Sequence, residues 1–404
     1  MYDVMIIGGG IVGLSTAYAL TQKNPTLKIA VVEKEDSWAK HQTGHNSGVI
    51  HSGIYYKPGS LKARFAKEGG RKLTAFCDEY GISYEQCGKV IVATDENELT
   101  VMHNLYERGL QNGLDLRLLD QAELKEEEPY VNGIKAIKVP QAGIIDYVGI
   151  CSAIVTVLES RGADLFLGTE ANDIKESPNE VTVETASSTY RTKHLVNCCG
   201  LQSDRVARRS GQNPDLKIVP FRGEYFELKP EKEYLVRNLI YPVPNPDFPF
   251  LGVHFTRMIG GGVEAGPNAV LGFKREGYRK RDISLKDLSE TLMYPGFWKL
   301  ASNYWKEGLE EMVRSFNKGA FVRSLQRLIP SIEEDDLKPA PAGIRAQALK
   351  SDGSLVDDFF LVHSKRSTHV CNAPSPAATA CFPIGEHIAT ALDIERPVKI
   401  SSSS

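Results

Sequence analysis

The sequence has little excess charge of either sign. Its 48 Lys and Arg residues are offset by 51 Asp and Glu residues, which leaves a formal net charge of -3. A chain with this balance has no global basic field to attract nucleic acid, and no acidic tail of the kind that stays disordered. We therefore expect no nucleic-acid partner, and a charged ligand must be bound by a local cluster of opposite charge.

Paired cysteines and long apolar runs are also lacking. The seven cysteines are odd in number and include no Cys-x-x-Cys pair, which argues against a disulfide framework and a structural zinc site. The histidines show no metal-ligand spacing, so we expect no metal. No run reaches the roughly 18 uncharged apolar residues of a membrane span, and no secretory leader precedes the first apolar segment. These features predict a cytoplasmic protein, with a solvated serine tail at 401–404.

A glycine-rich turn follows the first apolar segment. Residues 2–7 are typical of a strand buried on both faces, residues 11–22 place apolar side chains at helical spacing, and residues 28–34 form a second apolar run. Together they predict a strand, a turn, a helix and a second strand. This is the βαβ unit that binds dinucleotides.

The turn itself reads Gly8-x-Gly10-x-x-Gly13. Gly8 permits a tight turn, Gly10 lets the backbone approach a pyrophosphate, and Gly13 allows close helix packing, while the helix N-terminus favours an anion. Glu33 ends the second strand twenty residues after Gly13. A carboxylate there accepts hydrogen bonds from ribose hydroxyls and repels a 2′-phosphate, which disfavours NADP. The motif does not separate FAD from NAD.

The rest of the chain divides into two kinds of segment. Strand and helix patterns return at 194–200 and 369–392. Segments with β-formers in antiparallel style lie at 89–96, 180–186 and 224–230. We predict an α/β fold in which a Rossmann-like dinucleotide-binding domain is assembled from discontinuous segments and an α+β second domain has a mixed, mainly antiparallel sheet. The first domain comprises 1–85, 145–220 and 337–400, and the second comprises 86–144 and 221–336. The Pro-rich residues 242–250 are expected to form a loop or a sheet edge.

Residues 43–69 carry small residues, two histidines and a tyrosine pair, a mixture too polar for a core. This segment resembles the flavin-contacting region of L-2-hydroxyglutarate dehydrogenases, also called oxidases, in the D-amino-acid-oxidase-like FAD superfamily. The resemblance continues in the same order through 220–228, 241–278, 341–349 and 372–380. It implies FAD as cofactor and oxidation of L-2-hydroxyglutarate to 2-oxoglutarate by hydride transfer to flavin N5. It leaves open whether oxygen or a respiratory-chain quinone then takes the electrons.

The resemblance also implies which residues bind the flavin. Residues 43–52 would run along the isoalloxazine, and 197–200 would lie near the adenosine and pyrophosphate. A loop at 375–379 would present backbone N–H groups to the pyrimidine end, although Ala377 and Ala378 stand where the superfamily often has a glycine. The expected cofactor-binding residues are Gly8, Gly10, Ile11, Val12, Gly13, Glu33, Lys34, Thr43, Gly44, His45, Asn46, Ser47, Gly200, Ser375, Pro376, Ala377, Ala378 and Thr379.

Oxidation of a secondary alcohol requires a base that accepts the hydroxyl proton as the hydride leaves. His51 and His254 are the two candidates, because an imidazole titrates near neutral pH. His45 ranks third, since its side chain has a second possible role as a hydrogen-bonding partner of the flavin. For each of them the alternative is an ordinary structural histidine.

A five-carbon dicarboxylate needs cationic or strongly donating partners at both ends. Arg345, expected in a short loop before the final strand pair, is the leading clamp because the superfamily commonly places its carboxylate-binding arginine near there. Arg257 is a secondary candidate, with a plain surface charge as the alternative. Tyr55 and Tyr241 are candidate donors to the other carboxylate, or else packing anchors.

Residues 296–330 combine six aromatic side chains with six Lys or Arg residues. One interpretation is a basic, aromatic helical surface that lies on a membrane and passes electrons to a quinone. The other, which the residues favour, is a pair of amphipathic helices that cover the sheet of the second domain. The oligomeric state is left open by the sequence.

Three rival functions share features with this reading. An amine or amino-acid oxidase of the same superfamily would share the fold and Arg345, but it does not need the 241–278 block. A glycerol-3-phosphate dehydrogenase is disfavoured because no basic cluster is evident for a phosphate. A non-catalytic assembly protein would use FAD only structurally.

Overall fold

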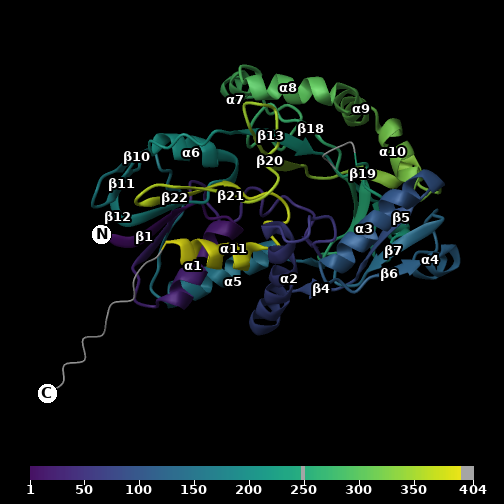
Figure 1. The fold of residues 1–404 in the computed structure, drawn as a ribbon, viewed down its shortest axis with the longest axis horizontal. Coiled ribbons are helices and arrows are strands. Elements are labelled where there is room, and N and C mark those ends of the chain that lie inside the picture. Colours follow the sequence, from purple (N-terminus) through teal and green to yellow (C-terminus); the bar gives the residue numbers. More distant parts are fainter. Residues whose placement is uncertain (247–250, 393–404) are drawn as a thin grey trace.

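The structure, a computed structural model, describes residues 1–246 and 251–392. Two units lie beside each other, one around the N-terminus and the other at the far end of the molecule (Figure 1). An eight-stranded sheet forms the centre of each unit, and two three-stranded sheets complete the fold. The predicted α/β class with a second, mixed domain is confirmed.

The first sheet is mainly parallel at its centre. Strand β12 pairs with β1 and β22, and β1 pairs with β2, all in parallel. Strands β10 and β11 extend one edge in antiparallel fashion. The strands of this sheet are β1 (Tyr2–Ile7), β2 (Ile29–Val32), β9 (Asp164–Phe166), β10 (Asp173–Glu176), β11 (Val181–Glu184), β12 (Thr189–Asn197), β21 (Phe360–His363) and β22 (Ser367–Asn372). The predicted order of strand, glycine turn, helix and strand at the N-terminus is therefore confirmed.

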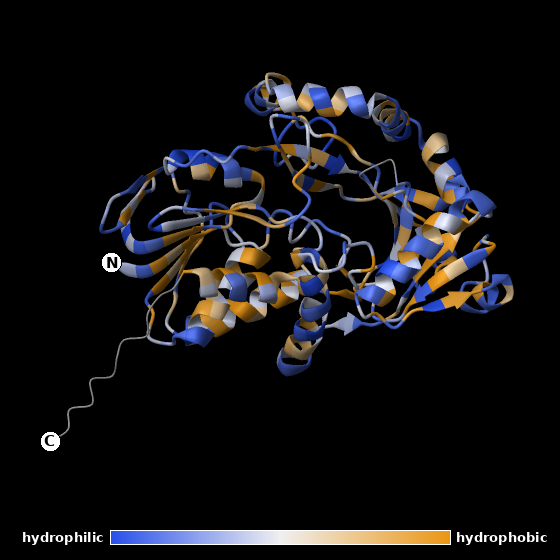
Figure 2. Cartoon of the chain, viewed as in Figure 1, coloured by the Kyte–Doolittle hydropathy of each residue, from blue (hydrophilic) through white to orange (hydrophobic). Residues whose placement is uncertain are grey.

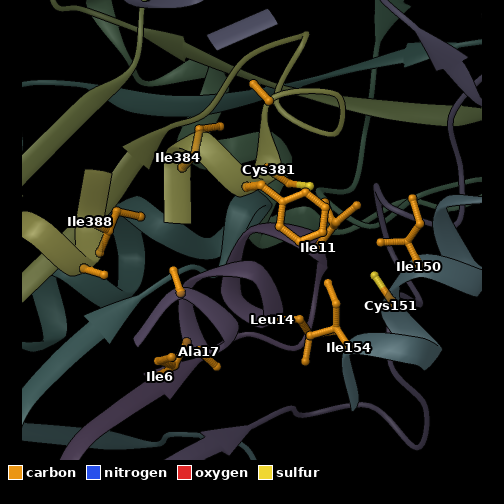
Figure 3. Close-up of a cluster of buried hydrophobic side chains, with 14 of the residues drawn as sticks. Ile6, Ile11, Leu14, Ala17, Ile150, Cys151, Ile154, Cys381, Ile384 and Ile388 are labelled. Carbon is orange, nitrogen blue, oxygen red and sulfur yellow. The ribbon is translucent and has the colours of Figure 1, made fainter. Parts of the chain in front are cut away.

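The helices of the first unit lie on both faces of its sheet. They are α1 (Ile11–Lys23), α2 (Leu61–Tyr80), α5 (Tyr147–Ser160), α6 (Ser203–Arg209) and α11 (Cys381–Ala391). Helices α5 and α11 pack against α1 (Figure 3), whereas α6 packs on the opposite face. Leu14 and Ala17 of α1 belong to the same buried cluster as Ile154 of α5 and Ile384 of α11. A Cβ at Gly385 would lie 2.5 Å from the carbonyl oxygen of Ser15, so α11 approaches α1 to backbone contact. Because α1 is buried along most of its length, its residues are mainly apolar.

The second unit is built on an antiparallel sheet, except that β15 and β5 pair in parallel. Its strands are β5 (Lys89–Ala93), β6 (Arg117–Leu119), β7 (Lys135–Val139), β14 (Phe226–Leu228), β15 (Leu239–Pro242), β16 (His254–Arg257), β17 (Val263–Gly266) and β19 (Leu337–Pro339). The helices α3 (Leu99–Gln111), α4 (Gln121–Glu127) and α10 (Lys318–Gln326) accompany it. Because β19 pairs with β14, the chain leaves this sheet a few residues after the boundary predicted at 337.

Two small sheets connect the units. One contains β13 (Lys217–Gly223), β18 (Val270–Leu271) and β20 (Gly343–Leu349), and the other contains β3 (Val49–Ile50), β4 (Tyr84–Glu85) and β8 (Gly143–Ile145). Short 3-10 turns occupy Glu96–Glu98, Gly200–Gln202, Pro230–Leu235 and Glu334–Asp336. No strand covers 243–246, in keeping with the loop expected there. The rest of that segment, 247–250, and the serine tail lie outside the described residues.

A buried ion pair fastens the 241–278 block to the first unit. The Arg275 guanidinium, on the segment after β18, contacts the Asp204 carboxylate of α6. Both side chains are almost completely inaccessible, and Asp204 also pairs with Arg208. Although burial opposes ionisation, Arg275 and Arg208 hold the pKa of Asp204 below its usual range. An unpaired charge in such a position costs about 3–5 kcal/mol, so the pair fixes the register of this segment.

An arch of helices runs along one edge of the molecule (Figures 1 and 2). It consists of α7 (Leu285–Leu292), α8 (Pro295–Asn303), α9 (Trp305–Phe316) and α10, so residues 296–330 form three helices and not the expected pair. Only α10 covers the second sheet in the way expected, through Phe321, Val322 and Leu325. Within the described ranges, no helix has both the length and the hydropathy required to cross a bilayer.

Candidate active site

A cavity of about 1090 Å³ begins at the glycine turn and extends to the second sheet. Its wall includes Gly8 and Gly10 at one end and Tyr241 and His254 at the other. Residues from the 43–52 segment, from β20 and from the loop before α11 complete the wall. The volume is in the upper range of ligand pockets, as expected for an extended dinucleotide.

The glycine turn has the geometry that a phosphate site requires. Gly8 has φ +110°, and a Cβ there would lie 2.5 Å from the Cys198 carbonyl oxygen. A Cβ at Gly13 would lie 2.0 Å from the carbonyl oxygen of Gly8, so this glycine closes the turn against the helix. A Cβ at Gly10 would instead meet only the Thr43 hydroxyl, at 3.3 Å. The space in front of Gly10 thus stays open for a ligand.

The start of α1 is suited to an anion. No acidic residue lies in its first turn. The amide N–H of Ile11 donates to the Thr43 hydroxyl at 3.1 Å, which fixes the 43–52 segment to the helix start. First-turn amides and the helix dipole together attract phosphate oxygens.

Glu33 is held in place by the backbone around it. Its Oε2 accepts a hydrogen bond from Gly9 N–H at 2.7 Å, and its Oε1 accepts one from Glu35 N–H at 2.9 Å. Each carboxylate oxygen has a further lone pair, and Glu33 lines the cavity. The carboxylate is therefore ordered and able to accept a ribose hydroxyl. The role of Gly9 in this arrangement was missed by the sequence analysis.

Lys34 lies in a compact ionic cluster beside the cavity. Its ammonium pairs with Glu35 and, at 3.0 Å, with Glu276, and it lies 3.1 Å from Nε2 of His41. Burial opposes the charge, but the two carboxylates raise the pKa of Lys34. Glu35, His41 and Glu276 have the spacing of metal ligands, yet the Lys34 ammonium already supplies the positive charge among them.

The loop before α11 reaches the cavity with Ser375, Pro376, Ala377 and Ala378. Thr379 has a different position. Its hydroxyl accepts the His51 amide at 3.1 Å and lies 2.9 Å from the Tyr147 hydroxyl, so it ties the loop to the 43–52 segment. Most of the other expected cofactor residues line the cavity, namely Gly8, Gly10, Ile11, Val12, Glu33, Lys34, Thr43, His45, Asn46, Ser47 and Gly200. Gly13, Gly44 and Thr379 are not part of the lining.

The two candidate bases line the same end of the cavity. Nδ1 of His254 lies 2.8 Å from the Gly252 carbonyl oxygen, which requires the proton on Nδ1 and leaves Nε2 as an acceptor. The imidazole ring stacks on Tyr241 with centroids 3.9 Å apart. Burial lowers the pKa of both His51 and His254 to about 3, and nearby cationic side chains contribute. Both imidazoles are therefore neutral in the ordinary pH range.

Arg345 lies in strand β20, and the prediction that it belongs to a loop is wrong. Residues 343–349 pair with β13 along its whole length, and Arg345 is opposite Phe221. The Pro-rich sequence just before this strand favours a loop, so the start of the strand was not predicted. Arg345 lines the cavity, and its charge is close enough to lower the pKa of both histidines.

Arg257 does not line the cavity. Its guanidinium forms two hydrogen bonds with the Glu85 carboxylate, at 2.8 and 3.0 Å, and a third with the Arg237 carbonyl oxygen. Tyr55 and Tyr241 do line the cavity. Lys89, a buried residue beside both tyrosines, was missed. Its signal in the sequence is a lysine placed directly before the apolar run at 90–93.

Comparison with known proteins identifies the cofactor. A family model described as FAD dependent oxidoreductase matches residues 3–391. The chain belongs to this family. Its cofactor is FAD, and the open space at Gly10, the α1 N-terminus and the ordered Glu33 carboxylate fit that molecule.

Relatives that are similar over nearly the full length share one name. The chain is 52% identical over 386 residues to an L-2-hydroxyglutarate dehydrogenase of Indibacter alkaliphilus, covering 95% of this chain and 97% of the relative. It is 48% identical over 406 residues to the mitochondrial L-2-hydroxyglutarate dehydrogenase of Homo sapiens, covering 96% and 88%.

Solved structures confirm the fold. The dithionite-reduced L-alpha-glycerophosphate oxidase of Mycoplasma pneumoniae with FAD bound has a TM-score of 0.79 at 23% identity, covering 98% of this chain and 96% of that one. The glycine oxidase of Geobacillus kaustophilus has a TM-score of 0.73 at 17% identity, with the same coverage. At these identities the likeness concerns the fold alone.

Gly10→Val is expected to weaken FAD binding by about 10- to 100-fold, because the added methyl groups occupy the space in front of the α1 N-terminus. The backbone at Gly10 has φ -81° and ψ 175°, which valine adopts easily, so the variant should fold. The measurement is FAD affinity by flavin fluorescence titration of the apoprotein. Gly260→Val, in an open position, is the control. Equal affinity in both variants would refute the placement of the phosphates.

Proposed function

We propose that this protein oxidises L-2-hydroxyglutarate to 2-oxoglutarate. The names of the full-length relatives support the substrate. The observation that carries the chemistry is the meeting of His254, His51 and Arg345 at one end of the FAD cavity. When bound, FAD accepts the hydride that leaves C2 of the substrate.

His254 is the base in this proposal. The Gly252 carbonyl holds the proton on Nδ1, so Nε2 presents a lone pair to the substrate hydroxyl. A neutral imidazole is required at the start of the reaction, and the low pKa keeps it neutral down to pH values well below 5. The hydroxyl proton moves to Nε2 while the C2–H bond breaks, and the C2–O bond becomes the carbonyl of the product.

Arg345 binds a substrate carboxylate in this proposal. A guanidinium offers two parallel N–H donors that match the two oxygens of a carboxylate. Its strand also brings Gly343 close to the 43–52 segment, since a Cβ at Gly343 would lie 2.7 Å from the His45 carbonyl oxygen. The charge of Arg345 also acts on His51, so Arg345 lies close to the segment assigned to the isoalloxazine, beside which the carboxylate next to C2 would bind.

Anaerobic mixing of the holoenzyme with L-2-hydroxyglutarate is expected to bleach the flavin absorbance. D-Amino acids, sarcosine and glycerol 3-phosphate, the substrates of the rival enzyme classes, should leave it unchanged. Stopped-flow absorbance near the flavin maximum measures the reaction. A flavin that stays oxidised with L-2-hydroxyglutarate would rule out the proposed substrate.

His254→Gln is expected to lower kcat by about 10²- to 10⁴-fold, because glutamine keeps the size of the side chain but accepts no proton. KM should change much less. His51→Gln, the matched variant at the other neutral imidazole, should have the smaller effect on kcat. Steady-state kinetics of both variants decide between them, and a larger loss in His51→Gln would transfer the role of base to His51.

We also propose that the outer face of α7–α9 rests on a membrane surface. On α9 the buried side chains are polar, namely Glu311 and Ser315. Several apolar side chains of residues 293–316 face outward, namely Trp298 (58% exposed), Trp305 (61%), Leu309 (59%), Met293 (74%) and Phe316 (75%). A large exposed apolar face marks an interaction site, and tryptophans beside lysines suit the lipid headgroup region. Such contact favours a quinone over oxygen as electron acceptor.

Trp305→Ser combined with Phe316→Ser is expected to lower binding to vesicles containing anionic lipid by at least about tenfold, because two large apolar side chains no longer enter the bilayer. Co-sedimentation of the holoenzyme with the vesicles measures this. Val148→Ser, at a residue of α5 that is 46% exposed, controls for the general loss of surface hydrophobicity. Vesicle binding that is absent in the parent protein, or unchanged in the double variant, would contradict membrane contact.

A further inference from the structure

Lys89, the first residue of β5, is buried and has no counterion among the described residues. It is only 1% exposed. Its Nζ lies 4.0 Å from the centre of the Tyr241 ring and 5.5 Å from that of Tyr55. Among the described residues, Nζ makes neither a hydrogen bond nor an ion pair. Buried charges in proteins are normally paired, because their desolvation is costly, so the fold alone does not account for this lysine.

Lys89 lies in the interior of the second sheet. β5 lies between β15 and β7, with Lys89 opposite Leu239 on one side and Val139 on the other. Burial lowers the pKa of the Lys89 ammonium to about 7, which the nearby Cys87 only partly offsets. Near neutral pH the amine is thus divided between its charged and neutral forms. An anion placed beside it would favour the charged form.

The hydroxyl of Tyr55 is a second unused donor in the same place. It is buried and has no hydrogen-bonding partner among the described residues. Leaving such a group unsatisfied is unfavourable, and native proteins seldom do so without a reason. Tyr55 lines the cavity, as does Tyr241. Lys89 is not part of the cavity lining, but its ammonium lies against the Tyr241 ring, so one aromatic wall of the pocket carries the Tyr55 hydroxyl and has the Lys89 ammonium against it.

The two cationic side chains near the histidines come from different sheets. Lys89 is on β5 of the eight-stranded sheet, and Arg345 is on β20 of a three-stranded sheet. Both lower the pKa of His51 and of His254, so both act on the same end of the cavity. A ligand that contacts both side chains is matched best by one with two negative groups. A five-carbon dicarboxylate has this form.

We propose that Lys89, together with the Tyr55 hydroxyl, binds the C5 carboxylate of the substrate, while Arg345 binds the C1 carboxylate beside the reacting carbon. This inference rests on the proposed oxidation of L-2-hydroxyglutarate and adds its determinant of selectivity. Lys89 then gives the site a preference for a dicarboxylate over a 2-hydroxy acid with an apolar tail. The role is one of recognition, since the C5 carboxylate takes no part in the bond changes.

The pH dependence of substrate binding follows from the groups that surround Lys89. His51 and His254 are neutral above about pH 4, because burial lowers the pKa of each to about 3. Burial raises the pKa of the Tyr55 and Tyr241 hydroxyls and of the Cys87 thiol. Lys89 has a pKa of about 7, and Glu264, whose pKa burial raises to about 7, acts on Tyr225 and not on the two histidines.

The test compares two substrates that differ only at C5. L-2-Hydroxypentanoate has a methyl group where L-2-hydroxyglutarate has the second carboxylate. In Lys89→Met, kcat/KM for the dicarboxylate should fall by about 10- to 100-fold, the effect expected for a lost charge-assisted hydrogen bond. The value for the monocarboxylate should stay nearly constant. Lys138→Met, on the neighbouring strand β7, is the control and should leave the ratio unchanged.

The same experiment includes a second variant and a pH profile. Tyr55→Phe keeps the ring and should lower selectivity for the dicarboxylate several-fold. In the parent enzyme, KM for the dicarboxylate should rise as pH increases above about 7, where Lys89 loses its proton. That rise should be absent in Lys89→Met and absent for the monocarboxylate. FAD content of each variant reports whether it has folded.

The outcomes separate this inference from the proposed function. If L-2-hydroxyglutarate does not reduce the flavin of the parent enzyme, the function itself is wrong. If the parent flavin is reduced but Lys89→Met and Tyr55→Phe affect both substrates equally, the function stands and the C5 site is wrong. A KM for the dicarboxylate that is independent of pH in the parent enzyme would also overturn the assignment to Lys89.

Discussion

The packing of α11 against α1 is the contact on which the cofactor-binding unit depends. It joins elements from opposite ends of the chain, and the absence of a side chain at Gly385 lets the two backbones touch. The glycine turn precedes α1 directly, and the 375–378 loop precedes α11 in the same way. Because the two helices pack together, the turn and the loop both reach one cavity.

The N-terminal half of the FAD site could be predicted because its signals are local. The glycine turn, the start of the first helix and the end of the second strand lie within 33 residues, and their spacing alone indicates their roles. The hydrogen bonds that order Glu33 could not be predicted from the spacing, because they depend on how the turn folds back over the strand. The fold class followed from alternating strands and helices. Strand β20 was missed because prolines beside it suggested a loop.

The substrate end of the cavity was harder to read from sequence. Arg257 and Lys89 are both basic residues on strands of one sheet, but their surroundings are opposite. Arg257 reaches Glu85 at the surface, whereas Lys89 lies against two tyrosines and pairs with no carboxylate of the described residues. The residues that surround Arg257 and Lys89 come from distant segments of the chain, so no periodic pattern in the sequence predicts them. The arch poses a similar problem, because an amphipathic pattern does not say which face of a helix is covered.

The discontinuous first unit has a consequence for synthesis. A chain leaves the ribosome from its N-terminus, so β1, α1 and β2 appear first while β22 and α11 appear last. Until residues 381–391 have emerged, α1 lacks the helix that covers one of its sides, and the loop at 375–378 has no place to dock. The part of the FAD cavity formed by the 375–378 loop is therefore completed only after the last helix has been synthesised.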